Sequence, residues 1–241
     1  MMATLDDVLT AELRAERAQK EWNGTSRWYA SGSGMCWRQR WYQARDVERD
    51  PGSEPDARAI LAMDVGTWLH ERIQAALVRA GGDAVVAEVS WRDEQIGFGA
   101  RADLIVNGPA FGLGEDQTPC TVEIKTLAGY GFRVAVKAGE PEERHVAQGM
   151  HSAVAHGHRG VLVVYLSRDT LATASWWIPV TDEWRQRIQH ELHRIAELDK
   201  RDKPPHRVIP GIGVVGDPLD RAAPWHCRYC SWRERCTVDG E

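Results

Sequence analysis

The spacing of hydrophobic and polar positions changes several times along the chain, and each change predicts a different element. The pattern predicts helices in five stretches: residues 4–21, 35–49, 56–79, 142–156 and 182–200. It predicts strands in five others: residues 84–91, 97–106, 121–127, 161–166 and 173–180. This order of elements is typical of an α/β fold with a mixed sheet flanked by helices.

Prolines and glycines divide this pattern into three parts. The stretch Asp50–Pro55 reads DPGSEP and predicts a linker, and residues 203–224 contain five prolines, which predicts an irregular connector. We therefore expect an N-terminal helical segment in residues 1–55, a core in residues 56–202 and a C-terminal segment in residues 203–241. A length of 241 residues with 43% hydrophobic content suits one large domain or one domain with a small lobe.

Composition bears on the cellular location of the protein. No apolar run approaches the ~20 residues that a membrane-spanning helix needs, and the first residues lack the features of a secretion signal. Five cysteines are present, three of them close together near the C-terminus, so a disulfide framework fits poorly. We expect a cytoplasmic protein of a bacterial or phage-infected cell.

Charge is unevenly distributed. The formal net charge of −5 argues against a surface that binds DNA everywhere, yet residues 26–49 and 221–236 each sum to +3 and are rich in aromatics. Arginine beside aromatic residues suits a DNA strand, because phosphates need positive charge and bases can stack. The expected contacts are Arg38, Arg40, Trp41, Arg228 and Trp232. The alternative is that the tryptophans pack internally and the arginines are solvated.

The cysteines predict an inorganic centre. Three follow the pattern Cys227-x2-Cys230-x5-Cys236, and Cys36 lies far away near the other end of the chain. Thiolates at such spacing hold zinc or an iron–sulfur cluster. A centre that used all four would join the two ends of the chain in one lobe. Cys120 is left over and is expected to be a small buried residue.

Carboxylates and a lysine predict the chemistry of the core. Glu123 and Lys125 are two positions apart on a predicted strand, so both side chains lie on one face. Asp103 interrupts an apolar strand, where a carboxylate is costly unless it binds something. Two such carboxylates suit Mg²⁺ or Mn²⁺, and the lysine can position water or neutralise a phosphate. A surface salt bridge on an edge strand is the simpler alternative.

Histidines are less informative. His70 lies inside the predicted helix 56–79 and is a normal third ligand for Mn²⁺, although a lone helical histidine is more often structural. Around the predicted helix 142–156 four more histidines are expected on a solvated helix face and loop: His145, His151, His156 and His158.

Taken in order, these residues resemble the PD-(D/E)XK nuclease superfamily over nearly the whole chain. They look most like its RecB-type branch, which includes the AddB nuclease domain and the CRISPR-associated RecB-like exonucleases. The matching positions are Cys36, His70, Asp103, Glu123, Lys125, Gln148, Cys227, Cys230 and Cys236. Two positions depart from the branch pattern: Ala102 replaces a proline, and Ser152 replaces a tyrosine four residues after the glutamine.

The resemblance implies a site and two cofactors. His70, Asp103 and Glu123 would bind the catalytic Mg²⁺ or Mn²⁺, with the backbone carbonyl of Ile124 as a further ligand. Lys125 would be the catalytic lysine, and Gln148 would complete the catalytic set on a helix that positions DNA. The four cysteines Cys36, Cys227, Cys230 and Cys236 would hold a [4Fe–4S] cluster, for which an all-cysteine zinc site is the alternative.

The function expected from this resemblance is that of a metal-dependent DNA nuclease, most simply an exonuclease on single-stranded DNA ends. Small phage-encoded enzymes of this group are known, and the length of the chain fits them. The alternative is an adaptor that binds DNA ends or a partner protein and cuts weakly or not at all. The presence of Asp103, Glu123 and Lys125 speaks against it. Oligomeric state, and a recombination or CRISPR partner, stay open.

Overall fold

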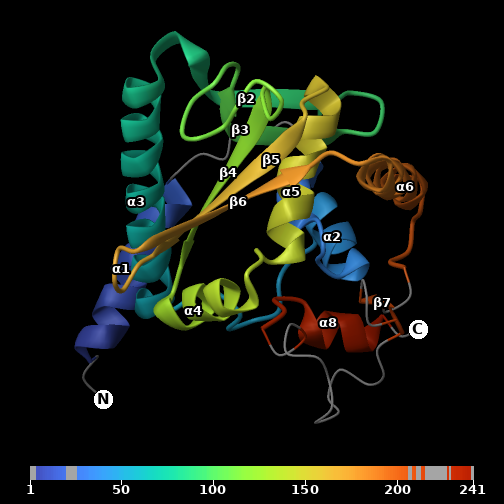
Figure 1. Cartoon of the computed structure of the whole chain (residues 1–241). Coiled ribbons are helices and arrows are strands. Elements are labelled where there is room, and N and C mark those ends of the chain that lie inside the picture. Colours follow the sequence, from blue (N-terminus) through green and yellow to red (C-terminus); the bar gives the residue numbers. More distant parts are fainter. Residues whose placement is uncertain are drawn as a thin grey trace.

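The computed structural model describes residues 4–19, 26–205, 208–209, 213–214, 227 and 229–239 (Figure 1). A six-stranded mixed sheet lies at its centre. Its strands are β1 (Trp28–Tyr29), β2 (Val85–Asp93), β3 (Phe98–Val106), β4 (Cys120–Leu127), β5 (Gly160–Ser167) and β6 (Thr173–Pro179). The predicted α/β fold with a mixed sheet flanked by helices is confirmed.

Helices cover the sheet and extend below it (Figure 1). They are α1 (Leu5–Gln19), α2 (Trp37–Ala44), α3 (Ala57–Gly81), α4 (Gly129–Ala138), α5 (Glu143–His156), α6 (Asp182–Asp199) and α8 (Arg233–Val238). Short 3-10 turns lie at Ala30–Gly32 and Gly82–Ala84, and β7 (Val208–Ile209) pairs with β8 (Gly213–Val214) in a separate ribbon. Among the described helices none has the length and apolar character that crossing a membrane would require.

Strand β3 organises the sheet because it has three neighbours. β2 pairs antiparallel with it along its whole length, from Phe98 to Val106. β1 and β4 therefore share its other edge, with β1 parallel at Phe98 and Gly99 and β4 antiparallel from Leu104 onward. The part of this edge between them carries no strand pairing within the described residues. This gap opens beside Asp103.

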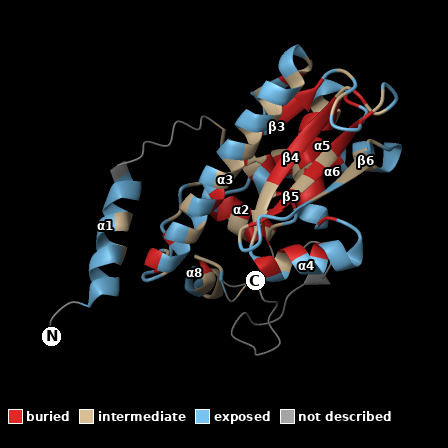
Figure 2. Ribbon diagram, turned by 60° about the vertical axis from the view of Figure 1, so that its left-hand side comes forward, coloured by how far each residue is buried: buried red, intermediate tan, exposed pale blue. Residues whose placement is uncertain are grey.

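The two faces of the sheet have separate cores. Figure 2 shows that the sheet strands and helix α5 are largely buried. On one face α3 packs Ile73 and Leu77 against Val122 and Ile124 of β4. On the other face α5 packs Met150 over β5, together with residues of α4 and α6. Strands buried on both faces usually read as nearly continuous apolar runs, as β5 does. β3 and β4 are also largely buried, but charged residues interrupt their apolar sequences. The carboxylates on these strands are therefore exceptions inside a hydrophobic interior.

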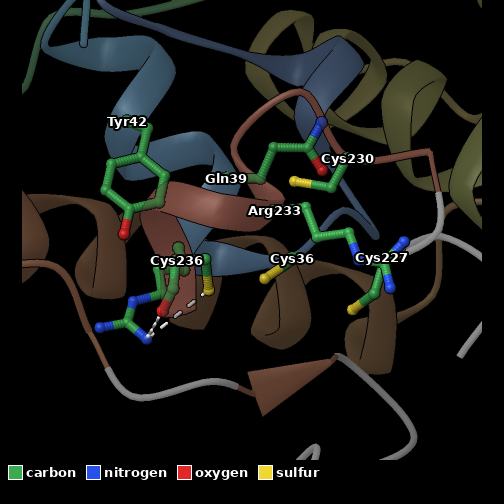
Figure 3. Close-up of a pocket in the computed structure, with 8 residues that line it drawn as sticks. Cys36, Gln39, Tyr42, Cys227, Cys230, Arg233 and Cys236 are labelled. Atoms are coloured by element: carbon green, nitrogen blue, oxygen red, sulfur yellow. Dashed lines mark hydrogen bonds between the residues drawn. The ribbon is translucent and has the colours of Figure 1, made fainter. Parts of the chain in front are cut away.

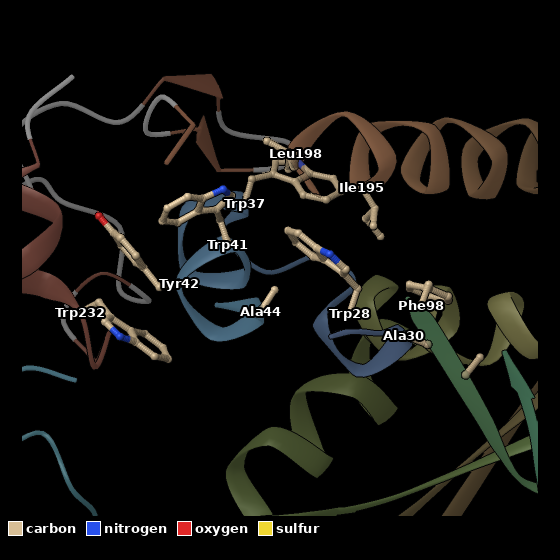
Figure 4. Packing of buried hydrophobic residues seen from close by; sticks show 11 residues of the cluster. Trp28, Ala30, Trp37, Trp41, Tyr42, Ala44, Phe98, Ile195, Leu198 and Trp232 are labelled. Atoms are coloured by element: carbon tan, nitrogen blue, oxygen red, sulfur yellow. The ribbon is translucent and has the colours of Figure 1, made fainter. Parts of the chain in front are cut away.

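A third core joins the two ends of the chain (Figure 4). Aromatic residues from β1, α2 and the C-terminal segment pack here with the last turns of α6: Trp28, Trp37, Trp41, Tyr42, Trp232, Ile195 and Leu198. Asp50 fixes α8 to this core, because its carboxylate accepts hydrogen bonds from the backbone N–H groups of Glu234 and Arg235 at 2.6 and 3.0 Å. It acts as a helix cap supplied from a distant part of the chain.

This packing corrects the expected DNA contacts. Arg38 and Arg40 are only 2% and 4% exposed, and Trp41 and Trp232 are buried as well. Side chains enclosed in this way cannot reach a DNA strand on the surface. The alternative is right for the tryptophans and wrong for these two arginines, which are buried instead of solvated. Arg228 lies outside the described residues.

Element boundaries differ from prediction in a few places. The helix predicted over residues 35–49 is confined to Trp37–Ala44, so Cys36 is its N-cap residue and not part of its first turn. Arg45 instead donates to the last carbonyls of α6, including that of Asp199 at 3.0 Å, where a cation is favourable. Five helices and strands of the described residues were not predicted: β1, α4, β7, β8 and α8.

Candidate active site

Asp103 stands where β3 and β4 separate. The two strands pair only as far as Leu104 with Val122. Just beyond, Asp103 Oδ2 accepts a hydrogen bond from the backbone N–H of Ile124 at 2.6 Å. This bond links the two strands where a ladder bond would otherwise do so. A nearly buried carboxylate is thereby fixed at the opening between the strands.

Glu123 is the most enclosed charged group of the site. It is 0% exposed, and neither of its carboxylate oxygens accepts a hydrogen bond from the described residues. Lys125 Nζ lies 2.5 Å from its Oε1, as an ion pair that lacks hydrogen-bond geometry. Burial raises the pKa of Glu123 to about 7, although Lys125 works in the opposite direction. A carboxylate kept in such surroundings is costly unless a cation completes it.

Helix α5 brings Gln148 to the same place. Lys125 Nζ donates a hydrogen bond to Gln148 Oε1 at 3.0 Å. The helix can approach this closely because the next residue is Gly149. A Cβ there would lie 2.6 Å from a methyl group of Val161 and 3.4 Å from Cβ of Glu123. Lys125 is thus held between a carboxylate on its own strand and an amide on the helix above it.

His70 approaches from the opposite side, on α3. Its Nε2 lies 3.2 Å from Asp103 Oδ2. The hydrogen bond with Asp103 raises the pKa of His70 above its usual range, against the effect of burial. The structure therefore brings together the predicted side chains of the core from two helices and two strands: His70, Asp103, Glu123, Lys125 and Gln148.

Two further residues support this group and were not predicted as part of it. Gln74, one turn after His70, donates from Nε2 to the backbone carbonyl of Asp103 at 2.8 Å and to Glu88 Oε1 at 2.7 Å. Glu88 has a φ of 57° within β2, a conformation that costs a residue with a Cβ about 1 kcal/mol or more. Helical spacing from His70 could have identified Gln74, but nothing in the sequence marks Glu88.

If this group binds a divalent metal, we expect Gln74→Ala to weaken that binding while the protein stays folded. Loss of the bridge frees Asp103 and Glu88, and removal of such supporting bonds typically lowers metal affinity about 10–100-fold. The measurement is Mn²⁺ binding to wild type and variant by calorimetric titration. Binding should still saturate at high Mn²⁺ concentration. Arg72→Ala, on the exposed side of the same helix, should leave the curve unchanged; an equal shift in both variants would contradict the role given to Gln74.

The fit of this group to a divalent metal can be judged from its donors. Within the described ranges, no three His, Cys, Asp or Glu side chains are arranged to hold a metal ion as they lie. The donor set nevertheless suits Mg²⁺ or Mn²⁺, with two carboxylates and one imidazole. Glu123 is the strongest sign, since Oε1 is paired only with the ammonium of Lys125 and Oε2 has no hydrogen-bonding partner in the described structure. In the present arrangement His70 and Asp103 contact each other directly.

The four predicted cluster cysteines meet at a second place. Cys36, Cys227, Cys230 and Cys236 line one cavity of about 30 Å³ (Figure 3). Cys36 comes from the start of α2, and the others come from the C-terminal segment. Burial raises the pKa of the Cys36 thiol, and it raises that of Cys230 to about 11. These thiols would release protons on binding a metal centre.

Other candidate residues have structural roles. Cys120 is fully buried, as predicted. The prediction for the histidines around α5 is wrong for three of four, since His145, His151 and His158 are 7% exposed or less. His145 Nδ1 lies 2.6 Å from the hydroxyl of Tyr165, and His158 Nδ1 lies 2.9 Å from that of Thr121. Non-local partners, which the sequence pattern does not reveal, explain their burial.

Comparison with known proteins gives the fold. No protein-family model matches the chain, and no curated protein matches it. The crystal structure of SSO0001 is similar over the whole of both chains, with a TM-score of 0.51 and 16% identity. LHK-Exo in complex with dAMP is similar over 79% of this chain and 93% of its own, with a TM-score of 0.52 and 21% identity. A second structure of LHK-Exo, an alkaline exonuclease from Laribacter hongkongensis, has a TM-score of 0.50 and 19% identity over the same shares. The chain therefore shares the fold of these proteins.

Proposed function

We propose that the protein is a metal-dependent deoxyribonuclease of the PD-(D/E)XK type. The observation that carries the proposal is the fully buried carboxylate of Glu123, which lacks hydrogen bonds and lies beside Lys125 and close to Asp103. Such a group destabilises a fold, and Lys125 offsets this only in part, because burial still raises the pKa of Glu123 to about 7. A lysine beside it adds the positive charge that phosphoryl chemistry requires.

The residues have distinct roles in this proposal. His70, Asp103 and Glu123 would hold Mg²⁺ or Mn²⁺, with the carbonyl of Ile124 as a further ligand. The bound metal would supply Lewis-acid activation of water and phosphate. Lys125, held by Gln148, would orient the water for in-line attack on phosphorus and offset charge on the phosphate. The new phosphorus–oxygen bond forms as the bond to the 3′-oxygen breaks.

DNA is the proposed substrate, and digestion from a single-stranded end is the proposed mode. The similar structures support this, because LHK-Exo is described as an alkaline exonuclease and one of its structures contains dAMP. The DNA-binding adaptor remains the second candidate. It does not explain why Glu123 is fully buried with only Lys125 as its partner, since a carboxylate in this position is costly to the fold.

We further propose a [4Fe–4S] cluster in the cysteine cavity. The support is that all four cysteines line one cavity, although they come from opposite ends of the chain. An all-cysteine zinc site is the alternative. The cluster would join residues 1–55 to residues 203–241, on either side of the core in residues 56–202.

We expect the wild-type protein to degrade end-labelled single-stranded DNA in the presence of Mn²⁺ or Mg²⁺, and Lys125→Ala to lose at least about 100-fold of this activity. The Lys125 ammonium has no substitute at this position, because its partners Glu123 and Gln148 carry no positive charge. Both proteins would be purified anaerobically and compared by gel electrophoresis of the products, which also gives the polarity.

The control is Lys137→Ala, which removes a lysine from the exposed face of α4. It should cut like the wild type. Equal cutting by wild type and Lys125→Ala would mean that the site is assigned wrongly. A cluster-loaded wild type that binds DNA but cuts neither single-stranded nor double-stranded substrate would favour the adaptor.

A further inference from the structure

Arg38, on α2, lines the same cavity as the four cysteines. Its Nη1 donates to the backbone carbonyl of Cys236 at 3.3 Å and lies 3.6 Å from the sulfur of that residue. Its Nη2 donates to the carbonyl of Asp239 at 3.5 Å, and its Nε is buried without a hydrogen-bond partner. The guanidinium therefore faces sulfur and carbonyl groups.

No carboxylate neutralises this arginine in the part of the chain that the structure describes. The nearest candidate, Asp239, uses its carboxylate elsewhere: Oδ2 accepts from the hydroxyl of Tyr42 at 2.6 Å, and Oδ1 pairs with Nε of Arg235 at 3.3 Å. A buried arginine is usually paired with a carboxylate, as Arg40 is: its Nη1 lies 2.7 Å from Oε1 of Glu191. Arg38 is as deeply buried as Arg40 and has no such partner.

A buried guanidinium without an anion is strongly unfavourable. The cavity holds a second arginine, Arg233, whose Nε is likewise buried and without a hydrogen-bond partner. Arg233 is half-buried, and no carboxylate of the described residues forms an ion pair with either arginine. Four thiolates that hold a metal centre carry net negative charge, and the two arginines then lie where they are needed.

We propose that Arg38 is the charge-compensating and sulfur-bonding residue of the cysteine-bound cluster, and that it raises the reduction potential of the cluster and keeps it in place. This inference rests on the cluster proposed above and is independent of nuclease activity. A nearby positive charge and an N–H···S contact both stabilise the more negative, reduced form. Removing them should shift the potential to more negative values and speed loss of the cluster.

The test compares anaerobically purified, reconstituted wild type with Arg38→Met and Arg38→Lys. Iron and sulfide per chain, visible absorbance and the midpoint potential in a mediated dithionite titration would be measured for each. Arg38→Met, which removes the charge, should have a clearly more negative potential and lose absorbance several-fold faster under a chelator. Arg38→Lys keeps the charge without the planar fork, so it should shift less in the same direction.

Arg49→Met is the matched control, because it removes a charge from the same lobe at an exposed position over the ring of Trp232. It should leave both quantities unchanged. If Arg38→Met does not fold, Arg38→Lys still decides the matter. A potential and a loss rate equal to those of Arg49→Met in the folded Arg38 variants would overturn the inference.

A wild type without iron and sulfide after reconstitution would also overturn the inference. It would leave the nuclease proposal intact, provided that cleavage still depended on Lys125.

Discussion

Glu123→Gln is expected to abolish DNA cleavage and, at the same time, to stabilise the metal-free protein. Cleavage should fall by at least about 1,000-fold, because the amide cannot supply the anionic oxygen that a divalent metal needs. Stability should rise because burial disfavours the charged carboxylate and raises the pKa of Glu123 to about 7. A functional residue that destabilises its own fold is common at active sites.

The pH dependence of this effect follows from the direction of the shift. The folded protein holds the proton of Glu123 up to about pH 7, whereas an unfolded chain releases it near pH 4.5. The charged form thus destabilises the fold increasingly as pH rises from 4.5 through 7. Glu123→Gln carries no such charge, so its free energy of unfolding at pH 8 should exceed that of the wild type by about 1–3 kcal/mol, after allowance for the partner lost by Lys125.

Chemical denaturation of both metal-free proteins at pH 5 and pH 8 would measure this gain, which should be small at pH 5. Glu94→Gln, at an exposed turn, should match the wild type in stability and cleavage at both pH values. A Glu123→Gln protein that is less stable than the wild type at pH 8 would show that the carboxylate is structural.

The candidate site residues could be selected from the sequence because local rules make them stand out. Glu123 and Lys125 share a strand face, and Asp103 breaks an apolar run, so each is conspicuous in the sequence itself. Their meeting point could not be predicted from pattern. It depends on β3 and β4 pairing only beyond Asp103, which is a property of the sheet as a whole. Glu88 is invisible in the sequence for the same reason.

Helix α4 and the buried arginines show where local rules fail. Residues 129–138 contain two glycines and two valines, which are weak helix formers, yet Phe132 and Ala135 pack against the sheet and stabilise the helix. Arginine is normally a surface residue. Arg38 and Arg40 are buried because their partners lie 198 and 151 residues away, a separation at which sequence patterns carry no information.

Arg40→Met is expected to destabilise the fold by about 3–5 kcal/mol, because it leaves Glu191 charged and buried. Arg40 Nη1 lies 2.7 Å from Glu191 Oε1, the hydroxyl of Ser33 donates to the same oxygen at 2.9 Å, and His151 Nε2 lies 3.3 Å from Oε2. This group connects α2 with α5 and α6. His151 follows Gln148 by about one turn of α5. Loss of the contacts around Glu191 should therefore also displace Gln148 and lower the cleavage rate.

The pH dependence of stability distinguishes the contribution of the Arg40–Glu191 ion pair from that of side-chain packing. Burial acts to raise the pKa of Glu191, but His151 and Arg40 outweigh it and lower the pKa to about 2. The stabilisation is therefore present above pH 4.5 and is lost as pH falls towards 2. The unfolding temperatures of wild type and Arg40→Met should differ by roughly 10 °C at pH 7 and become equal in acid.

The control is Arg187→Met, which breaks the exposed ion pair with Glu143 between α6 and α5. It should lower the free energy of unfolding by less than about 1 kcal/mol. A difference that stayed constant down to the lowest pH at which both proteins fold would assign the effect to packing of the arginine side chain over Trp37.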